Sequence, residues 1–240
     1  MSEKQKSILN DEKYLKYTYS NRVAPPGDYP NQLAKWLLDN VYKKTGKIAD
    51  FGCGRGDYLE VFKNLGFEPY GFDISPSINK LTKYKVKQVD FINDEAPYTK
   101  DRFDHIFSKS VVEHLHEPTS YLSAIYKSLN EGGNAVVMTP SWSHTYWGPF
   151  YIDYTHVTPF TAYSLKSALE MAGFKNVTVK YFYQLPVLWK YPWLKFFIKL
   201  FAKLPFPYSP YNNVPWGVSN RFNKLVRFSK EVMLLAVAEK

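Results

Sequence analysis

A run of glycines beside an aspartate is the part of the sequence with the clearest chemical meaning. Residues 47–51 are mostly apolar and strand-like, and Gly52, Gly54 and Gly56 follow them at every second position before a helical pattern begins at Tyr58. Such glycines can take positive φ and let a ligand approach the backbone, while the following helix directs its unpaired N–H groups at the same place. The pattern predicts a strand, a glycine turn and a helix around a nucleotide-like ligand, with a tight structural turn as the alternative.

The spacing of the glycines indicates which ligand. A dinucleotide site has G-x-G-x-x-G, whereas this turn has G-x-G-x-G with Asp50 two residues before it. A carboxylate there disfavours a pyrophosphate and favours a cationic ligand. The stretch resembles motif I of the class I S-adenosylmethionine-dependent methyltransferases, which implies that Asp50 reaches the aminoacyl end of the cofactor. It also implies a cofactor loop made of Gly52, Cys53, Gly54 and Gly56, in which we expect Cys53 to be a small filler and not a nucleophile.

Two more acidic residues end expected strands. Residues 68–74 form a second strand with Asp73 near its end, where a carboxylate can bind both ribose hydroxyls, and Ile74 beside it. A third strand over residues 84–89 is followed by Asp90 and Phe91, which the resemblance places at the adenine amino group and ring. Each carboxylate alone could be a solvated strand end. Three in succession at the carboxyl edge of an α/β sheet favour a ligand site.

A fourth expected strand, residues 103–108, leads into the sequence Val-Val-Glu-His-Leu-His-Glu-Pro. This segment resembles the post-strand motif of the ubiquinone-type and small-molecule methyltransferases, where it lines the sulfonium and the incoming acceptor. The resemblance places Ser108 and Ser110 against the cofactor and makes His114 a candidate general base, because imidazole can accept a proton near neutral pH. The alternative is that His114 only orders the loop.

A second histidine motif, Asp-x-x-His-x-x-Pro-Phe-Thr, spans residues 153–161 before a helix over 162–172 and resembles a signature of the same subgroup. Asp153 and His156 are either a second acid–base pair or a pair that pins the loop. We favour pinning, because a carboxylate–histidine hydrogen bond commonly serves orientation. No metal centre is expected, since acidic residues and histidines cluster only weakly, at Glu113, His114 and Glu117.

The resemblance covers about residues 32–183 and the last strand, and it implies the fold. We expect an α/β, Rossmann-like, seven-stranded, mostly parallel sheet with helices on both faces and an antiparallel last strand. The remaining expected elements are helices over 31–42 and 118–130 and strands over 134–139, 174–183 and 231–239.

The chain is expected to divide into two parts. Residues 1–31 form an N-terminal arm, and residues 32–240 form the methyltransferase domain. The arm is either a lid, in which Tyr17 or Arg22 touches the cofactor carboxylate, or a plain surface segment.

Composition constrains the setting. A chain of 240 residues is most simply one domain, and its single cysteine excludes an internal disulfide and fits a reducing compartment. No signal-peptide pattern and no run of 18 uncharged apolar residues is present, so we expect a cytoplasmic protein. The net charge of +9 is uneven, because residues 175–240 hold 11 Lys and Arg against 2 acidic residues while residues 1–174 are balanced at 20 each.

An insertion at about 184–230 separates the last two strands and supplies most of this excess. Its segment 193–204 has Lys195, Lys199 and Lys203 four apart among bulky apolar residues, a pattern typical of a helix. A basic amphipathic helix can lie in a membrane interface, giving peripheral contact through residues 190–204 on the cytoplasmic face, or it can be a lid over the acceptor pocket. Nucleic-acid binding is less favoured, because the lysines alternate with apolar residues and do not form an open basic surface.

These features predict S-adenosylmethionine-dependent methyl transfer by in-line displacement, with O-methylation of a small-molecule, glycan or lipid-linked acceptor preferred. The alternatives are a methyltransferase acting on RNA through the insertion, a nicotinamide-dependent enzyme, and a non-catalytic nucleotide-binding or membrane-associated protein. The residues fix neither the acceptor nor the oligomeric state.

Overall fold

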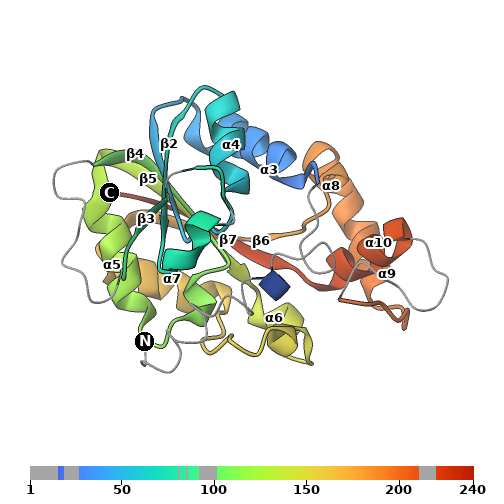
Figure 1. Ribbon diagram of the computed structural model, residues 1–240. Coiled ribbons are helices and arrows are strands. Elements are labelled where there is room, and N and C mark those ends of the chain that lie inside the picture. Colours follow the sequence, from blue (N-terminus) through green and yellow to red (C-terminus); the bar gives the residue numbers. More distant parts are fainter. Residues whose placement is uncertain (1–15, 19–26, 81, 85, 92–101, 211–219) are drawn as a thin grey trace.

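The computed structural model describes residues 16–18, 27–80, 82–84, 86–91, 102–210 and 220–240. Its centre is a seven-stranded sheet in the order β3-β2-β1-β4-β5-β7-β6 (Figure 1). Strand β7 is antiparallel to both of its neighbours, and the other neighbouring pairs are parallel. The predicted fold class is confirmed. The strands are β1 Lys47–Phe51, β2 Glu68–Asp73, β3 Val86–Gln88, β4 Phe103–Lys109, β5 Leu129–Pro140, β6 Lys175–Phe182 and β7 Met233–Glu239.

Helices cover both faces of this sheet. Alternate side chains of each strand point to opposite faces, so Ala49 packs against the layer of α5 (Pro118–Ser128) and α7 (Ala162–Met171), while Ile48 packs against that of α3 (Tyr29–Leu37) and α4 (Asp57–Asn64). The other helical segments are η1 Leu38–Tyr42, η2 Pro76–Lys80, η3 Val112–His114, α6 Trp142–Thr145, η4 Pro149–Ile152, α8 Val187–Lys190, η5 Pro192–Leu194, α9 Lys195–Ala202 and α10 Asn220–Lys230.

Several boundaries differ from the sequence-based expectation. The third strand is shorter than predicted and ends two residues before Asp90, and the fifth begins early, at Leu129, where it pairs with Phe103. The helix expected over 193–204 starts as the short turn η5 and continues as α9, because Pro192 interrupts the chain after α8. Helix α10 was not predicted, and its inward residues Asn223, Val226 and Ser229 are too polar to give a clear helical pattern.

The topology places the functional edge. Strands β1, β2 and β4 are parallel, so they end at one edge of the sheet, and the order reverses between β1 and β4. Such a reversal is where open α/β sheets bind ligands. In the described ranges, no helix has both the length and the apolar character needed to cross a bilayer. Most of the predicted arm, including Arg22, lies outside the described residues.

Candidate active site

A cavity of about 590 Å³ opens at this edge of the sheet. Its volume is within the range of small-molecule sites, about 300–1,000 Å³. Of the residues predicted to form the site, eleven line it: Asp50, Gly52, Cys53, Asp73, Ile74, Asp90, Phe91, Ser110, His114, Asp153 and His156. The cavity lining does not include Gly54, Gly56 and Ser108, which contact the residues that form it. The structure therefore brings together segments that are more than 100 residues apart.

The glycine turn is closely packed against its surroundings. Gly52 has φ of 80°, and a Cβ there would lie 2.3 Å from Val111 Cγ2. Gly56 has φ of 83°, and its Cβ would lie 2.6 Å from Thr82 Oγ1. Because both the positive φ and the missing Cβ are needed, neither position accepts another residue without strain. The turn holds its backbone at the cavity wall by this packing.

Asp50 is a buried carboxylate that lines the cavity. The residue is 3 % exposed, and its Oδ2 has no hydrogen-bond partner among the described residues. Burial raises the pKa of the Asp50 carboxyl well above its ordinary value, and the nearby charges of Asp73 and Asp57 add to the shift, while the Lys109 ammonium opposes it. A cationic ligand in the cavity beside this carboxylate would favour its ionised form.

Asp73 faces the same cavity from the end of β2. Its Oδ1 accepts the Ser75 N–H at 3.0 Å, and its Oδ2 accepts the Gly54 N–H at 3.0 Å. Burial raises the pKa of Asp73, and hydrogen bonds from the backbone N–H groups of Ser75, Gly54 and Ile74 oppose the rise. A carboxylate has about four acceptor sites, so Asp73 keeps acceptor capacity for a ligand hydroxyl. Gly54 thus orients a predicted binding residue.

The far side of this pocket is aromatic. Phe91 stacks on Phe51 with centroids 4.6 Å apart and meets the edge of Tyr121 at 5.2 Å. Ser108 lies behind that wall, with its Oγ 2.7 Å from the Tyr121 hydroxyl, which donates in turn to the Phe51 carbonyl at 3.2 Å. The direct cofactor contact expected of Ser108 is therefore not supported by this geometry. Ser110, with φ of 60°, lines the cavity as expected.

His114 is held by a hydrogen-bond chain. The Asp153 carboxylate only accepts, and its Oδ1 lies 2.6 Å from Thr155 Oγ1, so the Thr155 hydroxyl donates to it. The Thr155 oxygen must then accept from His114 Nδ1, which lies 2.8 Å away. This network assigns the proton to Nδ1 and the lone pair to Nε2. Burial lowers the pKa of His114, so the ring is neutral and able to accept a proton at physiological pH.

His156 has a different anchor from the one expected. Its Nδ1 lies 2.6 Å from the Phe150 carbonyl oxygen and donates to it, and its ring meets that of His114 with centroids 4.6 Å apart. Asp153 holds Thr155 through both the hydroxyl and the N–H, the latter at 3.0 Å. The loop is pinned, as favoured from the sequence, but by these partners in place of the expected Asp153–His156 bond.

Glu113 joins the two histidine motifs. Its carbonyl accepts the N–H groups of Val157 at 2.9 Å and Thr158 at 3.0 Å, and its buried Oε2 accepts from Thr139 Oγ1 at 2.9 Å. These bonds tie the loop after His156 to the turn that carries His114. The short turn η3 and the loop therefore present both rings to one space.

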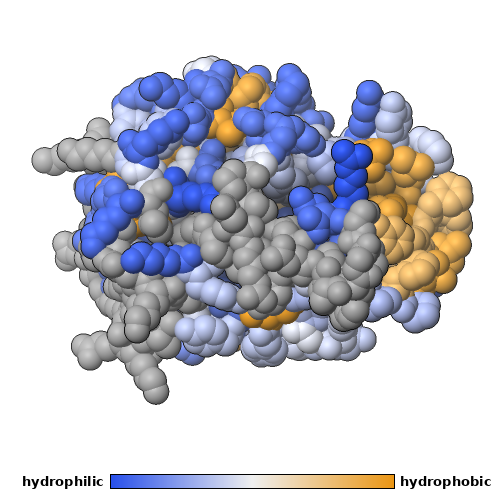
Figure 2. Space-filling model, turned by 45° about the vertical axis from the view of Figure 1, so that its right-hand side comes forward, coloured by the Kyte–Doolittle hydropathy of each residue, from blue (hydrophilic) through white to orange (hydrophobic). Residues whose placement is uncertain are grey.

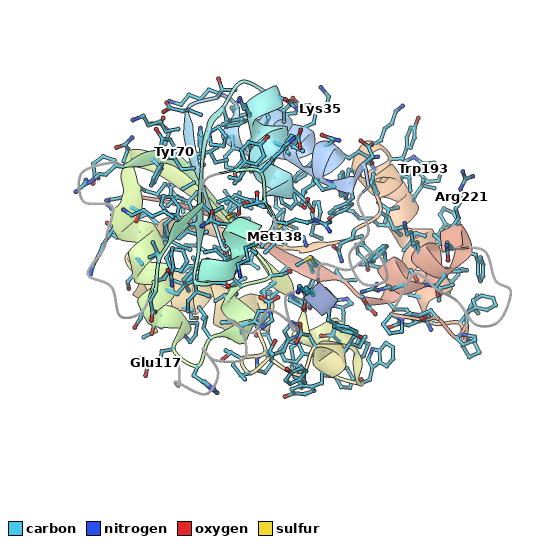
Figure 3. The ribbon with its side chains drawn as sticks, in the orientation of Figure 1. Lys35, Tyr70, Glu117, Met138, Trp193 and Arg221 are labelled. Carbon is cyan, nitrogen blue, oxygen red and sulfur yellow. The ribbon has the colours of Figure 1, made fainter. Side chains whose placement is uncertain are left out.

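The same residues offer a possible ion site. Ligand atoms of Glu113, His114 and His156 all lie within 4.8 Å of one another. The sequence-based expectation grouped Glu117 with the first two, but Glu117 is exposed and lies at the outer edge of the molecule (Figure 3). The expected absence of a metal centre stays a prediction.

Four residues that the sequence did not single out also shape the site. Lys109 ends β4 and lines the cavity, and burial lowers its pKa. Arg227 and Phe228 reach the cavity from α10, where Arg227 Nε bonds Glu231 Oε2 at 2.7 Å, and Thr155 acts through His114. A lysine at the end of a buried strand was a usable signal for Lys109, whereas α10 itself was missed.

A family model described as a methyltransferase domain matches residues 27–179, more than half of the chain. The chain belongs to this methyltransferase family. The predicted class I S-adenosylmethionine-dependent methyltransferase membership is thereby confirmed. The methyltransferase fold has a close structural counterpart in a SAM-dependent methyltransferase from Archaeoglobus fulgidus, with a TM-score of 0.64 and 24 % identity over 96 % of this chain and 100 % of that one.

The chain also resembles three curated transferases over part of its length. A demethylmenaquinone methyltransferase of Renibacterium salmoninarum is 27 % identical over 62 % of this chain and 63 % of its own length. A ubiquinone biosynthesis O-methyltransferase of Ruegeria sp. is 29 % identical over 60 % and 66 %. A tRNA U34 carboxymethyltransferase of Sulfurimonas denitrificans is 31 % identical over 40 % and 35 %. The chain thus spans less than two thirds of the length of each of these relatives.

Proposed function

We propose that this protein transfers the methyl group of S-adenosylmethionine to an oxygen of a small-molecule, glycan or lipid-linked acceptor. The observation that carries the proposal is the buried Asp50 carboxylate, which lines the cavity, has one oxygen without a hydrogen-bond partner among the described residues, and matches the cationic aminoacyl end of this cofactor. A nicotinamide cofactor would offer that oxygen no ammonium group.

The residues fit the rest of the cofactor as well. Asp73 keeps acceptor capacity for a ribose hydroxyl, and Asp90 and Phe91 line the same cavity and suit the amino group and ring of the adenine. The turn at Gly52 lets the ligand approach the backbone. Thr18, from the predicted arm, also lines the cavity, which supports closure of that arm over the bound cofactor.

When bound, the cofactor supplies an electrophilic methyl group on a sulfonium. The protein's part is to align an acceptor oxygen with the methyl–sulfur bond and to remove the acceptor proton. His114 Nε2 takes that proton, and the hydrogen bonds through Thr155 to Asp153 fix the tautomer and stabilise the imidazolium that forms. His156 packs against the His114 ring and keeps it in place.

The walls beyond the two histidines favour an acceptor with apolar surface. They include Pro149, Ile152, Phe228 and Val232, together with the Arg227 guanidinium. This mixture suits an apolar molecule with a hydroxyl or anionic group. The quinone-related names of two relatives agree with such an acceptor.

RNA is the second candidate acceptor. Two observations favour it: the net charge of +9 and the partial match to a relative named for tRNA. The apolar walls of the cavity weigh against it, because bases are recognised through polar edges and stacking platforms.

The test is transfer of radiolabelled methyl from S-adenosylmethionine into a host-cell extract that is then separated into lipid, polysaccharide, small-molecule, RNA and protein fractions. Label should enter the lipid, polysaccharide or small-molecule fraction and be lost in Asp73→Ala. Label in RNA would replace the proposed acceptor, and label in no fraction despite tight cofactor binding would contradict catalysis on host acceptors. Parallel reactions with EDTA test the predicted absence of a metal centre.

A further inference from the structure

An apolar surface stands out at the end of the molecule formed by α8, η5, α9 and α10. Large side chains are exposed there at helical spacing: Trp193 66 %, Phe196 70 %, Phe197 56 % and Leu200 59 %. Figure 2 shows hydrophobic side chains gathered at this end, and Figure 3 places Trp193 and Arg221 at its outer side. We name Trp193, Phe196, Phe197 and Leu200 the aromatic stripe.

The stripe is not the core-facing side of α9. Leu194 and Ile198 make that side, packing against the buried Tyr183, Leu188 and Val232. Helix α9 therefore already has its tertiary contacts, and the stripe remains outside as additional apolar surface. Exposing four such side chains to water is unfavourable, so an apolar partner or environment would stabilise this face.

The chain segment that carries the stripe has charges of one sign. Residues 184–230 contain eight Lys and Arg and no Asp or Glu. Lys190, Lys199 and Lys203 are exposed beside the stripe. An apolar stripe bordered by cations complements a surface that is apolar inside and anionic at its rim.

We propose that the aromatic stripe inserts into the interface of an anionic lipid bilayer and holds the protein on the membrane surface. A second copy of the chain fits less well, because a two-fold interface would set these lysines against one another without any acidic partner. The proposal goes beyond methyl transfer and does not depend on it.

The position of the stripe matters for the cavity. Phe222 of α10 packs near Phe201 and Phe206 at this end, with centroids 6.4 and 5.7 Å away, while Phe228 of the same helix lines the cavity. Six residues of helix span about 9 Å. An acceptor anchored in the bilayer would therefore meet the cavity close to the membrane surface.

The experiment is flotation of the full-length protein with vesicles of pure phosphatidylcholine and of phosphatidylcholine with phosphatidylglycerol. Wild type should float with the anionic vesicles and much less with the neutral ones. Phe196→Ser/Leu200→Ser should bind at least about ten-fold more weakly, because two apolar side chains that are exposed in the free protein no longer enter the bilayer. Lys190→Gln/Lys199→Gln/Lys203→Gln, which removes the exposed cations beside the stripe, should bind roughly 100-fold more weakly at low salt.

The matched control is Tyr163→Ser/Met171→Ser on α7, where both side chains are even more exposed, at 84 % and 80 %. It should bind vesicles like wild type, and thermal unfolding should show that every variant folds. Equal flotation of wild type and Phe196→Ser/Leu200→Ser would overturn the proposal, as would absence of wild-type binding. A wild-type dimer that the same variant dissociates, without vesicle binding, would assign the stripe to self-association.

Discussion

Replacing Asp50 by Asn should weaken cofactor binding and at the same time stabilise the unliganded protein. The carboxylate is buried, its Oδ2 has no hydrogen-bond partner among the described residues, and Asp73 and Asp57 repel its charge. In the free protein this charge is unfavourable, whereas in the complex it would pair with the ammonium of S-adenosylmethionine. The same group should therefore act in opposite directions on stability and on binding.

The magnitudes follow from these contacts. A lost charge-assisted hydrogen bond costs about 1.5–3 kcal/mol, which raises the dissociation constant roughly 10- to 150-fold. Removing this buried charge should raise the free energy of unfolding by about 1 kcal/mol, after allowance for the lost attraction to Lys109. For a chain of this size, that gain corresponds to a rise of about 2–4 °C in the melting temperature.

The stabilisation should depend on pH. The folded pKa of Asp50 lies above the unfolded value of about 3.9, so above that pH the folded protein holds a proton that the unfolded chain has released. Wild-type stability from this group therefore falls as pH rises through the window between the two pKa values. The gain from Asn should be small near the unfolded pKa and larger at neutral pH.

Calorimetry provides both readouts. Melting temperatures are measured without ligand across this pH range, and S-adenosylhomocysteine, which keeps the aminoacyl end, is titrated into each variant. Asp39→Asn, an exposed position outside the cavity lining, makes the same charge change as a control. An Asp50→Asn protein that binds the ligand as tightly as wild type, or melts lower at neutral pH, would refute the reasoning.

Three further predictions concern the turn and the base. Thr155→Val should lower kcat about ten-fold with little effect on cofactor affinity, because His114 loses the acceptor that fixes its tautomer. Thr155→Ser keeps this acceptor and should keep activity. Equal losses in both variants would mean that Thr155 only packs. In the pH profile of kcat/KM, the acid limb should lie below the ordinary histidine pKa of about 6.5, because burial lowers the pKa of His114. His114→Gln should abolish that limb and lower the rate by about 10²–10⁴. An unchanged pH profile would exclude His114 as the base. Gly52→Ala should destabilise the protein by about 1–3 kcal/mol in chemical denaturation. Gly132→Ala is the control and should cost less, because Gly132 has a similar φ of 73° but no atom within 4 Å of an added Cβ. Equal effects would show that the contact with Val111 is unimportant.

The cofactor half of the site was largely predictable because its signals are local. A strand, a turn and a helix adjoin in sequence around Gly52, and strand-end carboxylates such as Asp50 and Asp73 reach one edge whenever parallel strands align. Even in this half of the site, the spacing of residues in the sequence does not predict which side chains reach the cavity, because packing decides that. Ser108 turns to Tyr121 and away from the cavity because the strand's alternation places its hydroxyl behind the wall.

The acceptor half was decided by contacts between distant segments. The chain from Asp153 through Thr155 to His114 joins residues 41 positions apart, and it depends on the Glu113 carbonyl holding the loop at Val157. Helix α10 carries Arg227 into the cavity from an insertion whose inward face is too polar to reveal a helix. By itself, the sequence determined the family and the edge of the sheet at which the strand-end carboxylates meet, because periodicity and turn chemistry are properties of neighbouring residues. It also determined the charge of the insertion, which is a matter of composition. Only the tertiary structure decided which hydroxyl orients the base and which face of α9 stays exposed, because those follow from how separate elements pack.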